Sequence, residues 1–553
     1  MKRKRLGEML LDGGLITPEK LDLALNVQRR THERLGQIIE RLGFINPDDI
    51  ARTVATQYGI PFVNLQGLRQ VELDKEAIDQ LTLDFCKRHT VLPVLKKGKP
   101  FLITQDILNT VGNDRALQIL GRRPIVLSTA TAIATLLETV AFGGVDGEKI
   151  VESTRGQISK GELNEFLGWL LGRAVLAGAS DIHVEPAGPV SVVRFRVDGV
   201  LQPEISLPRE RHDNLVNVLF GKSGIDLSDF QRLRDGRFSF KFAGRTLDVR
   251  FASSPTIEGP MVVMRILADT RSITKLDQLG HVDWNLQAMK ELIRHPFGVI
   301  LMVGPTGSGK TTTLYSLLAA LNDTQKKILT VEDPVEIKLP SIQQIQCNEK
   351  AGVTFAKAIR GFLRQDPDII LVGEIRDEET AREAFRAANT GHLVLSTLHA
   401  NSAVEAVARL VDLGLEPYRV ADTLIGVIAQ RLIRILCPKC AVPSPVAHYS
   451  KVRQPSEEGC ENCNGKGYVG RRVVAEVLQF SDDFRLMVHA MKPATEMVAH
   501  AKSEGFKPML DNGKHLVTEG LTSSQECERV VGIIDLEDEA RRERGGRARS
   551  VAG

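Results

Sequence analysis

The chain has 553 residues, of which 42% are hydrophobic and 25% charged, and its net charge is +3. It is too long for a single hydrophobic core, so we expect several globular domains. The nearly balanced charge gives no global electrostatic case for nucleic-acid binding. No apolar run approaches the roughly 18 residues that span a bilayer, and the opening MKRKR lacks the apolar core of a signal peptide. We therefore expect a cytoplasmic protein without a membrane span.

The chain opens with a tandem repeat. Residues 5–28 and 34–57 align at a spacing of 29 with seven identities in 24 columns, where chance gives roughly one or two. The identities are Arg5/Arg34, Leu6/Leu35, Gly7/Gly36, Gly14/Gly43, Ile16/Ile45, Pro18/Pro47 and Gln28/Gln57. Each unit predicts a short helix, a glycine turn and a second helix, which Thr17 or Asn46 caps and which begins with proline.

Two interpretations of this repeat are open. Duplicated helix pairs often exist only to bury each other's apolar faces, and that interpretation explains Leu10, Leu25, Ile39 and Val54. It does not explain an arginine at one end and a glutamine at the other end of both units. Arginine donates a bidentate fork to phosphate or to a guanine edge, and glutamine both donates and accepts hydrogen bonds. The paired set therefore indicates a two-fold symmetric anionic ligand with purine edges.

The rest of the chain divides by pattern. We expect an N-terminal domain over 1–145 and a polar, glycine-rich linker over 146–160. Residues 161–275 predict an amphipathic helix followed by a small sheet, because alternating runs such as VSVVRFRVDGVL follow the helical pattern. Helix and strand patterns then alternate over 276–436, as in a parallel α/β core. The remaining predicted segments are a cysteine module at 437–475, a helical region at 476–535 and a charged, disordered tail at 536–553.

A phosphate-binding motif lies in the α/β core. GPTGSGKT at 304–311 fits G-x-x-x-x-G-K-[ST], with a strand-like apolar run before it and helix-forming sequence after it. The glycines let backbone N–H groups surround phosphate oxygens, Lys310 would reach the β- and γ-phosphates, and Thr311 would hold Mg²⁺. A chance glycine-rich turn is the alternative, and these flanking patterns disfavour it. The predicted ATP and magnesium residues are Gly304, Pro305, Thr306, Gly307, Ser308, Gly309, Lys310, Thr311 and Thr312.

A second strand-like segment carries a candidate catalytic carboxylate. PDIILVGEIRD is apolar until Glu374, which would face the phosphates and orient or deprotonate the attacking water. A strand-end glutamate that meets only solvent is the alternative. The segment ILTVEDPVE is a further strand pattern that ends in Glu332, Asp333 and Glu336.

Histidines mark another strand pattern, TGHLVLSTLHAN. A single histidine is more often a satisfied core or surface residue than a functional one. At a strand end in this fold, however, His399, and with less support His392, would be placed to sense the γ-phosphate.

Four cysteines form two C-x-x-C knuckles. Cys437 and Cys440 are separated by 19 residues from Cys460 and Cys463, a spacing typical of a tetrathiolate zinc site. Four protein ligands leave no open position, so the metal would be structural. Two reduced redox-type pairs are the alternative, but the sequence around them is not thioredoxin-like.

These motifs resemble those of the traffic ATPases of type II secretion and type IV pilus assembly. GPTGSGKTTTLY is similar to the family's Walker A, TVEDPVE to its aspartate box, RQDPDIILVGEIRD to its Walker B region and TGHLVLSTLHAN to its histidine box. The preceding ASDIHVEP, RVDGVL and DVRFASSPTIEGPMVVMRIL resemble its second N-terminal domain. The resemblance spans nearly the whole chain, and four motifs in order make it specific.

The resemblance implies a multi-domain α/β fold with a RecA-like P-loop core, a PAS-like second N-terminal domain, a helical or mixed N-terminal regulatory domain and a small tetracysteine zinc module. It implies a homohexameric, Mg²⁺-dependent ATPase, peripheral to the inner membrane, that powers assembly of a pseudopilus or a pilus. Its partners would be an inner-membrane platform and an anchor protein, which dock on residues 60–150 and on the zinc region. The zinc segment favours export or extension over retraction.

The resemblance also implies that arginines complete the nucleotide site across a subunit boundary, because a guanidinium stabilises the charge on the γ-phosphoryl oxygens. Arg250 and Arg265 match the family's arginine positions in the domain before the core, and Arg360, Arg364 and Arg376 match those of the core. A structural salt bridge is the alternative for each arginine. The expected catalytic residues are Lys310, Glu332, Glu374, His399, Arg250 and Arg265. One departure is RLRDGR at 232–237, where the family usually has LPQDGR, so that Arg234 replaces a neutral residue.

The opening repeat resembles the cyclic-di-GMP-binding MshEN-type module of pilus and secretion ATPases. In that module two 24-residue motifs begin with RLG, end with Gln and are joined by five residues, as RRTHE joins them here. The implied ligand residues are Arg5, Leu6, Gly7, Leu10, Leu25, Gln28, Arg34, Leu35, Gly36 and Gln57. A ligand there would shift the motor between conformations by its differential affinity for them. The sequence leaves open whether it activates or inhibits.

Two other functions remain alternatives. A nucleic-acid-translocating or DNA-uptake motor would share the RecA-like hexamer, but the balanced charge and the lack of a basic, aromatic-interleaved stretch argue against nucleic acid. A nucleotide-controlled sensor with negligible turnover would not need the intact Lys310, Thr311 and Glu374. Secretion and pilus extension use the same motifs, so the sequence does not separate them.

Overall fold

A computed structural model describes most of the chain and divides it into two compact units, Met1–Ser272 and Ile273–Gly553. The described residues are 4–68, 71–143, 160–225, 232–242, 245–267, 274–323, 325–339, 341–444, 451–463 and 465–533. The predicted linker at 146–160, except its last residue, and the predicted tail at 536–553 lie outside the described residues. Among the described helices, none combines the length and the apolar character that crossing a bilayer requires.

The repeat folds into four helices, as predicted. They are α1 (Leu6–Asp12), α2 (Pro18–Thr31), α3 (Leu35–Arg41) and α4 (Pro47–Tyr58). The side chains of Thr17 and Asn46 cap the second helix of each unit, as the sequence predicts, because each accepts a hydrogen bond from a backbone N–H of the first turn. Helix α1 packs on α4 and α2 packs on α3, so each unit buries its apolar face against the other. This exchange of partners brings the beginning of one motif close to the end of the other.

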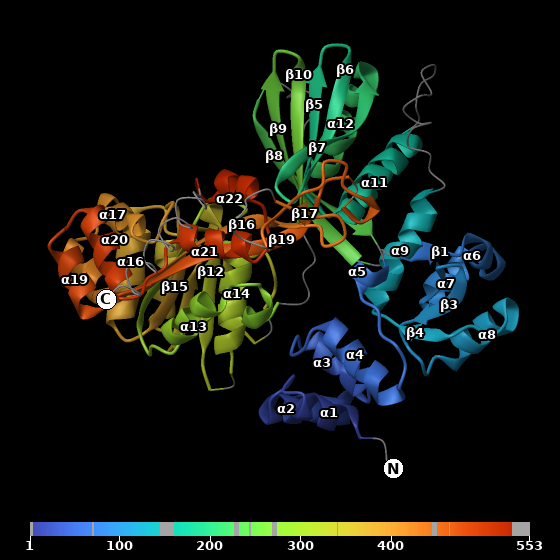
Figure 1. The fold of residues 1–553 in the computed structure, drawn as a ribbon, viewed down its shortest axis with the longest axis horizontal. Helices are drawn as coiled ribbons and strands as arrows, with labels where there is room; N and C mark the ends of the chain where they lie inside the picture. The colour runs from blue at the N-terminus through green and yellow to red at the C-terminus, as the bar shows by residue number, and fades with distance from the viewer. Residues whose placement is uncertain are drawn as a thin grey trace, which may run out of the picture. The chain divides into compact units, whose positions relative to one another are not determined.

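The part of the first unit that follows the repeat is a four-stranded sheet with helices around it (Figure 1). The strands are β1 (Glu72–Leu73), β2 (Val91–Lys96), β3 (Lys99–Thr104) and β4 (Ile125–Leu127). The helices are α5 (Leu65–Leu68), α6 (Lys75–Leu81), α7 (Leu83–His89), α8 (Thr110–Leu120) and α9 (Ala130–Gly143). This part has its own core, in which Val91, Leu92 and Ile133 are fully buried.

The last part of the first unit is a six-stranded antiparallel sheet in the order β7-β6-β5-β10-β9-β8 (Figure 1). The strands are β5 (Ala179–Ala187), β6 (Val190–Val197), β7 (Val200–Pro208), β8 (Arg234–Phe242), β9 (Arg245–Thr256) and β10 (Gly259–Leu267). Helices α11 (Lys160–Ala177) and α12 (Arg209–Ser223) pack on the sheet and bury Leu170, Phe195 and Leu219 against it. The predicted helix followed by a small sheet is confirmed.

The second unit is built on a seven-stranded sheet in the order β13-β12-β14-β15-β11-β16-β19. The strands are β11 (Gly298–Val303), β12 (Ile328–Glu332), β13 (Gln343–Gln346), β14 (Ile369–Val372), β15 (Leu393–Leu398), β16 (Leu424–Leu436) and β19 (Tyr468–Gln479). All neighbouring pairs are parallel except β16 with β19. The parallel α/β core that the alternating pattern predicts is confirmed.

Helices cover both faces of this sheet, which explains the uninterrupted apolar run of β11. Leu301 and Val303 point to one core cluster, and Ile300 and Met302 to another, because successive side chains of a strand alternate. Helices α13 (Asp283–Leu292) and α14 (Lys310–Leu321) contribute to the second cluster. The other helices are α15 (Phe355–Phe362), α16 (Glu378–Asn389), α17 (Glu405–Asp412), α18 (Pro417–Thr423), α19 (Asp482–His489), α20 (Ala494–Ser503), α21 (Met509–Thr518) and α22 (Ser524–Val530). Short 3₁₀ segments are Leu276–Gln278, Glu349–Ala351 and Glu461–Cys463.

The cysteine segment interrupts a long antiparallel hairpin. Strand β16 leads directly into Cys437, and β19 leaves the segment and returns along β16 to Gln479. A two-stranded ribbon, β17 (Val442–Pro443) with β18 (Arg453–Gln454), lies within the segment. The predicted boundary between 475 and 476 falls inside β19, which completes the sheet before the C-terminal helices begin. The sequence interpretation missed this strand.

Candidate functional site

The phosphate-binding motif forms the turn between β11 and α14. Gly304, Gly307 and Gly309 have φ angles of 144°, 78° and 86°, a region that favours glycine. The loop ends at the amino terminus of the 12-residue helix α14. Free backbone N–H groups and the helix dipole favour an anion there. The predicted strand–loop–helix context is confirmed.

Lys310 begins the helix and turns back onto the loop. Its Nζ donates to the carbonyl oxygens of Gly304 at 2.6 Å and Pro305 at 3.0 Å. Burial lowers the pKa of Lys310, and the negative charge of Glu374 opposes that shift. The ammonium group thus lies within electrostatic reach of the predicted catalytic carboxylate. Thr306 and Thr311 are exposed at the same end of the helix, with Thr312 beside them.

Glu374 follows β14 at the carboxyl edge of the parallel sheet. Strand β15 lies between β14, which Glu374 follows, and β11, which leads into the phosphate loop. One strand therefore separates the carboxylate from the loop. Arg376 donates to Glu374 and also lies 3.7 Å from a carboxylate oxygen of Asp333. The Glu374 side chain is 19% exposed, so it is placed by its surroundings and still accessible to water.

Glu332 has a different environment from Glu374. It ends β12 and is 4% exposed. Tyr315 of α14 donates to it, as do Thr330 at 2.6 Å and Gln344 at 3.0 Å. Burial and the Glu332 charge raise the pKa of Tyr315. Glu332 therefore ties the helix after the phosphate loop to two strands of the sheet, an anchoring contact that the sequence did not predict.

The two histidines of the third strand pattern lie at opposite ends of β15. His399 follows the strand, and its Nε2 is 4.0 Å from a Glu374 oxygen. His392 precedes the strand, where its Nδ1 is 2.8 Å from the Ala387 carbonyl oxygen. Parallel strands gather their carboxyl ends at one edge, so only His399 is brought to the edge that carries Glu374. The geometry thus gives no support to a phosphate-sensing His392.

The core arginines already have acidic neighbours. Arg360 of α15 pairs with Glu383 at 2.9 Å and Glu379 at 2.8 Å, and Arg364 donates to the Arg360 carbonyl oxygen at 3.0 Å. These contacts agree with the salt-bridge alternative for Arg360. Arg376 is the core arginine that contacts Glu374.

Arg250 and Arg265 belong to the first unit and face each other in the register of β9 and β10. Arg265 pairs with the buried Asp181 at 2.8 Å. Together with Arg237 and Asp235, these residues line a cavity of about 460 Å³. Arg234, the departure in RLRDGR, lies at the start of β8 opposite Ser253.

The repeat places its motif ends in two symmetric arrangements. Gln28 of the first motif donates to the Glu33 carbonyl oxygen at 3.0 Å, next to Arg34 of the second motif. Gln57 of the second motif donates to the Lys4 carbonyl oxygen at 2.7 Å, next to Arg5 of the first. Each candidate ligand region is therefore built from the beginning of one motif and the end of the other.

Most of the predicted ligand residues between the motif ends pack in the apolar core of the repeat. Leu10 is fully buried, and Leu6, Leu25 and Leu35 are half-buried in the repeat core. A side chain on Gly7 would contact Leu21 at 3.2 Å, and one on Gly36 would contact Ile50 at 3.4 Å, so both glycines allow close helix packing. This packing agrees with the helix-burial interpretation for the apolar positions, whereas Arg5 and Arg34 remain exposed.

The second region has an additional element that the sequence did not predict. Arg34 forms an ion pair of 2.5 Å with Asp106, which follows β3 in the neighbouring sheet domain. Arg34, Gly36 and Gln57 line a cavity of about 270 Å³, together with residues 105–108 and 127–131. Asp106 has no sequence signal, since only the fold brings it to the repeat.

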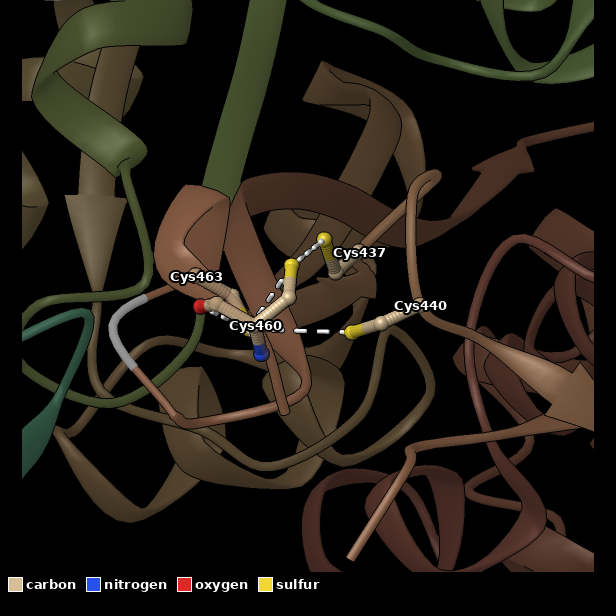
Figure 2. Close-up of side chains that lie close together, drawn as sticks. All are labelled: Cys437, Cys440, Cys460 and Cys463. Carbon is tan, nitrogen blue, oxygen red and sulfur yellow. Dashed lines mark hydrogen bonds between the residues drawn. The ribbon is translucent and has the colours of Figure 1, made fainter. Parts of the chain in front are cut away.

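The four cysteines converge as predicted (Figure 2). The Sγ atoms of Cys437 and Cys460 are 3.7 Å apart, those of Cys440 and Cys463 are 3.7 Å apart, and those of Cys460 and Cys463 are 3.8 Å apart. A tetrahedral zinc site with Zn–S bonds of about 2.3 Å places its sulfur atoms about 3.8 Å apart. The donor set and its spacing therefore fit a zinc ion.

Backbone groups support the sulfur atoms. The N–H groups of Cys460 and Gly467 each donate to Cys463 Sγ at 3.2 Å. Burial opposes ionisation of this thiol, but these donors and the neighbouring thiols outweigh it and lower the pKa of Cys463 to about 6. Such N–H···S bonds are the kind of support that orients metal-binding thiolates.

The phosphate loop, the strand-end carboxylate and the parallel sheet define a RecA-like P-loop nucleoside triphosphatase. The family model "Type II/IV secretion system protein" matches residues 157–529, and the model "MshEN domain" matches residues 58–141. The chain therefore belongs to the type II/IV secretion system family, carries an MshEN domain and is an ATP hydrolase. The MshEN match begins where the tandem repeat ends.

Characterised relatives agree with this assignment. The type IV pilus assembly ATPase PilB of Thermus thermophilus is 36% identical over 95% of this chain and 66% of its own length. The type II secretion system protein E of Pseudomonas aeruginosa is 42% identical over 87% of this chain and 98% of its own. PilB of Myxococcus xanthus is 34% identical over 96% of this chain and 98% of its own. The Legionella pneumophila ATPase DotB shares the fold, with a TM-score of 0.51 and 24% identity over 66% of this chain and 94% of its own.

Proposed function

We propose that this ATPase converts hydrolysis into conformational work that assembles a type II secretion pseudopilus or a type IV pilus. The observation that carries the proposal is one sheet edge on which the phosphate loop, Glu374 and His399 meet, in a chain that matches the secretion family over 157–529. Relatives that align over most of the chain are named for both machines. The choice between the two machines rests on no feature of this chain.

The chemistry follows from the same edge. The loop amides and Lys310 bind the β- and γ-phosphates, and Thr311 is the residue placed to hold Mg²⁺, which would neutralise charge on the phosphates. Glu374 orients or deprotonates the attacking water, and Arg376 holds its carboxylate in place. His399 is close enough to Glu374 to respond to a change at the γ-phosphate. Glu332 acts on this site through α14, because Tyr315 joins the two.

We propose a homohexamer in which the arginine-lined cavity of the first unit completes the nucleotide site of a neighbour. Support comes from the concentration of Arg237, Arg250 and Arg265 around one cavity. In the isolated chain Asp181 pairs with Arg265 and Asp235 lines the same cavity, and the γ-phosphate would compete with Asp181 for a guanidinium group. The six-stranded sheet with two helices supports a PAS-like assignment for this domain. We place the assembled motor in the cytoplasm, on a membrane platform and an anchor protein.

We propose that the repeat binds cyclic-di-GMP and controls the motor. Support comes from the symmetric placement of Arg5 and Arg34 beside the opposite motif's glutamine, which suits a two-fold symmetric ligand. The glutamines donate to backbone carbonyl groups in this structure, and Arg34 pairs with Asp106, so a phosphate would compete with Asp106 for Arg34. The adjacent MshEN match supports a regulatory role for this end of the chain.

We propose that Cys437, Cys440, Cys460 and Cys463 hold a structural zinc ion. It would fasten the far end of the β16–β19 hairpin, because Cys437 directly follows β16 and Gly467 directly precedes β19. Four sulfur ligands leave no position for a substrate. The metal would therefore act on stability and docking and not on hydrolysis.

The decisive experiment replaces Glu374 by Gln. The variant should bind ATP within about two-fold of the natural protein while hydrolysis falls on the order of 100-fold or more, since a general base contributes about 10²–10⁴ in rate. Glu378→Gln is the matched control, because Glu378 is exposed on α16 and pairs with Arg382 at 2.7 Å. Phosphate release and nucleotide binding are measured on the same preparations. Retained turnover in the Glu374 variant would remove this residue from the catalytic role.

The effect of single-stranded DNA on phosphate release distinguishes a nucleic-acid motor from a pilus or secretion ATPase. The pilus or secretion assignment expects no stimulation of phosphate release. Stimulation that weakens steeply with salt would favour translocation, because phosphate contacts release counterions.

A further inference from the structure

A buried glutamine lies behind the phosphate loop. Gln430 is fully buried on β16, the strand beside β11, and follows six residues that are all apolar or glycine. The strand register places Ala429 opposite Val303, so Gln430 comes level with the first glycine of the loop. A polar side chain at 0% exposure needs partners, and its partners here belong to the nucleotide-binding motif.

The side-chain amide of Gln430 forms two hydrogen bonds, one to a residue before Lys310 and one to a residue after it. Its Nε2 donates to the Ser308 carbonyl oxygen at 2.8 Å, and its Oε1 accepts from the Thr313 hydroxyl at 2.9 Å. Ser308 and Thr313 are themselves buried. The amide therefore connects the last part of the loop with the first turn of α14, and Lys310 lies between the two points.

The two ends of the loop also pack directly on this residue. A Cβ atom on Gly304 would lie 2.3 Å from the Gln430 carbonyl oxygen, and one on Gly309 would lie 2.9 Å from its Nε2. Both positions are conformationally restricted as well, with φ of 144° and 86°. These two motif glycines thus have a steric role beyond freeing N–H groups, since they let the loop close around Gln430.

We propose that Gln430 is a positioning residue for nucleotide binding, which fixes the phosphate loop and the start of α14 relative to each other. It contacts no phosphate itself. Only a side chain with a donor and an acceptor at this reach satisfies both partners, and neither an ionised Glu, which only accepts, nor Met provides the pair. Without it, a buried carbonyl and a buried hydroxyl lose their partners, and the loop relaxes away from the arrangement that receives phosphate.

The test compares the full-length chain with Gln430→Met, Thr313→Val and the double variant. Binding of MgADP is measured by calorimetry, and kcat and KM for ATP by phosphate release. Gln430→Met should weaken MgADP binding and raise KM on the order of tenfold or more, the consequence of leaving the Ser308 carbonyl and the Thr313 hydroxyl without their partner. Thr313→Val should have a smaller effect, and the double variant should bind no worse than Gln430→Met because it no longer buries an unpaired hydroxyl.

Two controls separate positioning from a general loss of structure. Thr313→Ser keeps the hydroxyl and should bind MgADP normally, and Gln479→Met makes the same exchange at an exposed site on β19. In calorimetry a purely structural defect lowers the stoichiometry and leaves Kd unchanged, whereas a positioning defect raises Kd at full stoichiometry. Unchanged Kd in Gln430→Met, or strictly additive effects of the two substitutions, would overturn the proposal. If Gln430→Met does not fold, equal Kd for Thr313→Val and Thr313→Ser would overturn it.

Discussion

The phosphate loop of the second unit and the repeat of the first unit both present cationic groups for anions, but they rest on different supports. Lys310 starts a helix whose Thr313 and Tyr315 hydroxyls donate buried hydrogen bonds to Gln430 and Glu332. Arg5 and Arg34 are exposed at the surface of a small helical core, and Arg34 pairs with Asp106, which lines the same cavity. The comparison indicates that the first site is pre-organised, and we propose that the second becomes ordered when its ligand binds.

The repeat and the second unit also differ in how deeply an ion pair is buried. In the second unit, the fully buried Glu526 side chain accepts bonds from Arg434 at 2.7 Å and Arg529 at 2.6 Å. In the repeat, Lys4 and Asp12 pair at 2.7 Å with both side chains more than half exposed. Because exposed pairs contribute little and broken buried pairs cost several kcal/mol, the pairs of Glu526 should stabilise the protein more than the Lys4–Asp12 pair does.

The largest predicted effect on stability is therefore at Glu526. Glu526→Gln leaves two guanidinium groups without their carboxylate, and we expect a loss of about 3–5 kcal/mol in the free energy of unfolding at neutral pH. Glu519→Gln is the control, since Glu519 pairs with Lys451 at 2.9 Å on the surface. Urea unfolding of the two variants measures the difference. A Glu526 variant as stable as the control would contradict the stabilising role of the buried Glu526 carboxylate.

Acid should remove the difference in unfolding free energy between the natural protein and Glu526→Gln. Burial opposes its charge, but Arg529 and Arg434 outweigh burial and lower the pKa of Glu526 to about 2. A depressed folded-state pKa means that the stabilisation is complete above the unfolded-state pKa of roughly 4.3 and is lost as pH falls towards 2. The stability gap between the natural protein and Glu526→Gln should therefore narrow between about pH 4.3 and pH 2. A constant gap would show that this carboxylate does not titrate as the contacts require.

Zinc removal should have an intermediate effect in the same unit. Chelation or Cys460→Ser is expected to loosen residues 437–467 and lower Tm by a few degrees, since each kcal/mol shifts Tm by roughly 2–4 °C in a domain of this size. Zinc content by elemental analysis and Tm are measured together, with Cys347→Ser as a control, since Cys347 is only half-buried and not part of the cluster. Zinc content that is unchanged in Cys460→Ser would contradict the four-cysteine site.

The sequence predicted those parts of the fold that local pattern determines. Proline after Thr17 and Asn46 located the second helix of each repeat unit, and the apolar run before Gly304 located the central strand. It did not predict β19, which looks like part of the cysteine module until its pairing with β16 is known. Long-range pairing has no local signature, so such a strand becomes visible only in the folded chain.

The candidate site divides in the same way. The motif and the strand pattern led us to predict Lys310 and Glu374 as site residues, because phosphate transfer needs those residue types at those places. The sequence did not predict Gln430 or Asp106, because they are single polar residues whose partners lie 117 and 72 residues away in the chain. The clue for Gln430 was an isolated polar residue in an apolar strand, which predicts a buried hydrogen bond but does not identify its partner.

The smallest predicted effect tests the exposed site. Arg5→Ala and Arg34→Ala should each weaken cyclic-di-GMP binding about tenfold, the value expected for a charge-assisted hydrogen bond at a surface. Because the arginines are exposed, the loss should shrink as salt is raised. Arg41→Ala is the matched control, since Arg41 is also exposed on α3 but pairs with Glu33 outside the motif ends.

Calorimetry and circular dichroism on the full chain separate the outcomes of that experiment. Weaker binding with unchanged helicity supports recognition by the two arginines. If the Arg5→Ala, Arg34→Ala double variant keeps the natural affinity, the ligand is bound elsewhere. If the natural protein does not bind cyclic-di-GMP at all, the repeat serves only to bury its own helices. In that outcome the contrast between a pre-organised site and a ligand-ordered site would no longer hold, because the repeat would have no ligand to order it.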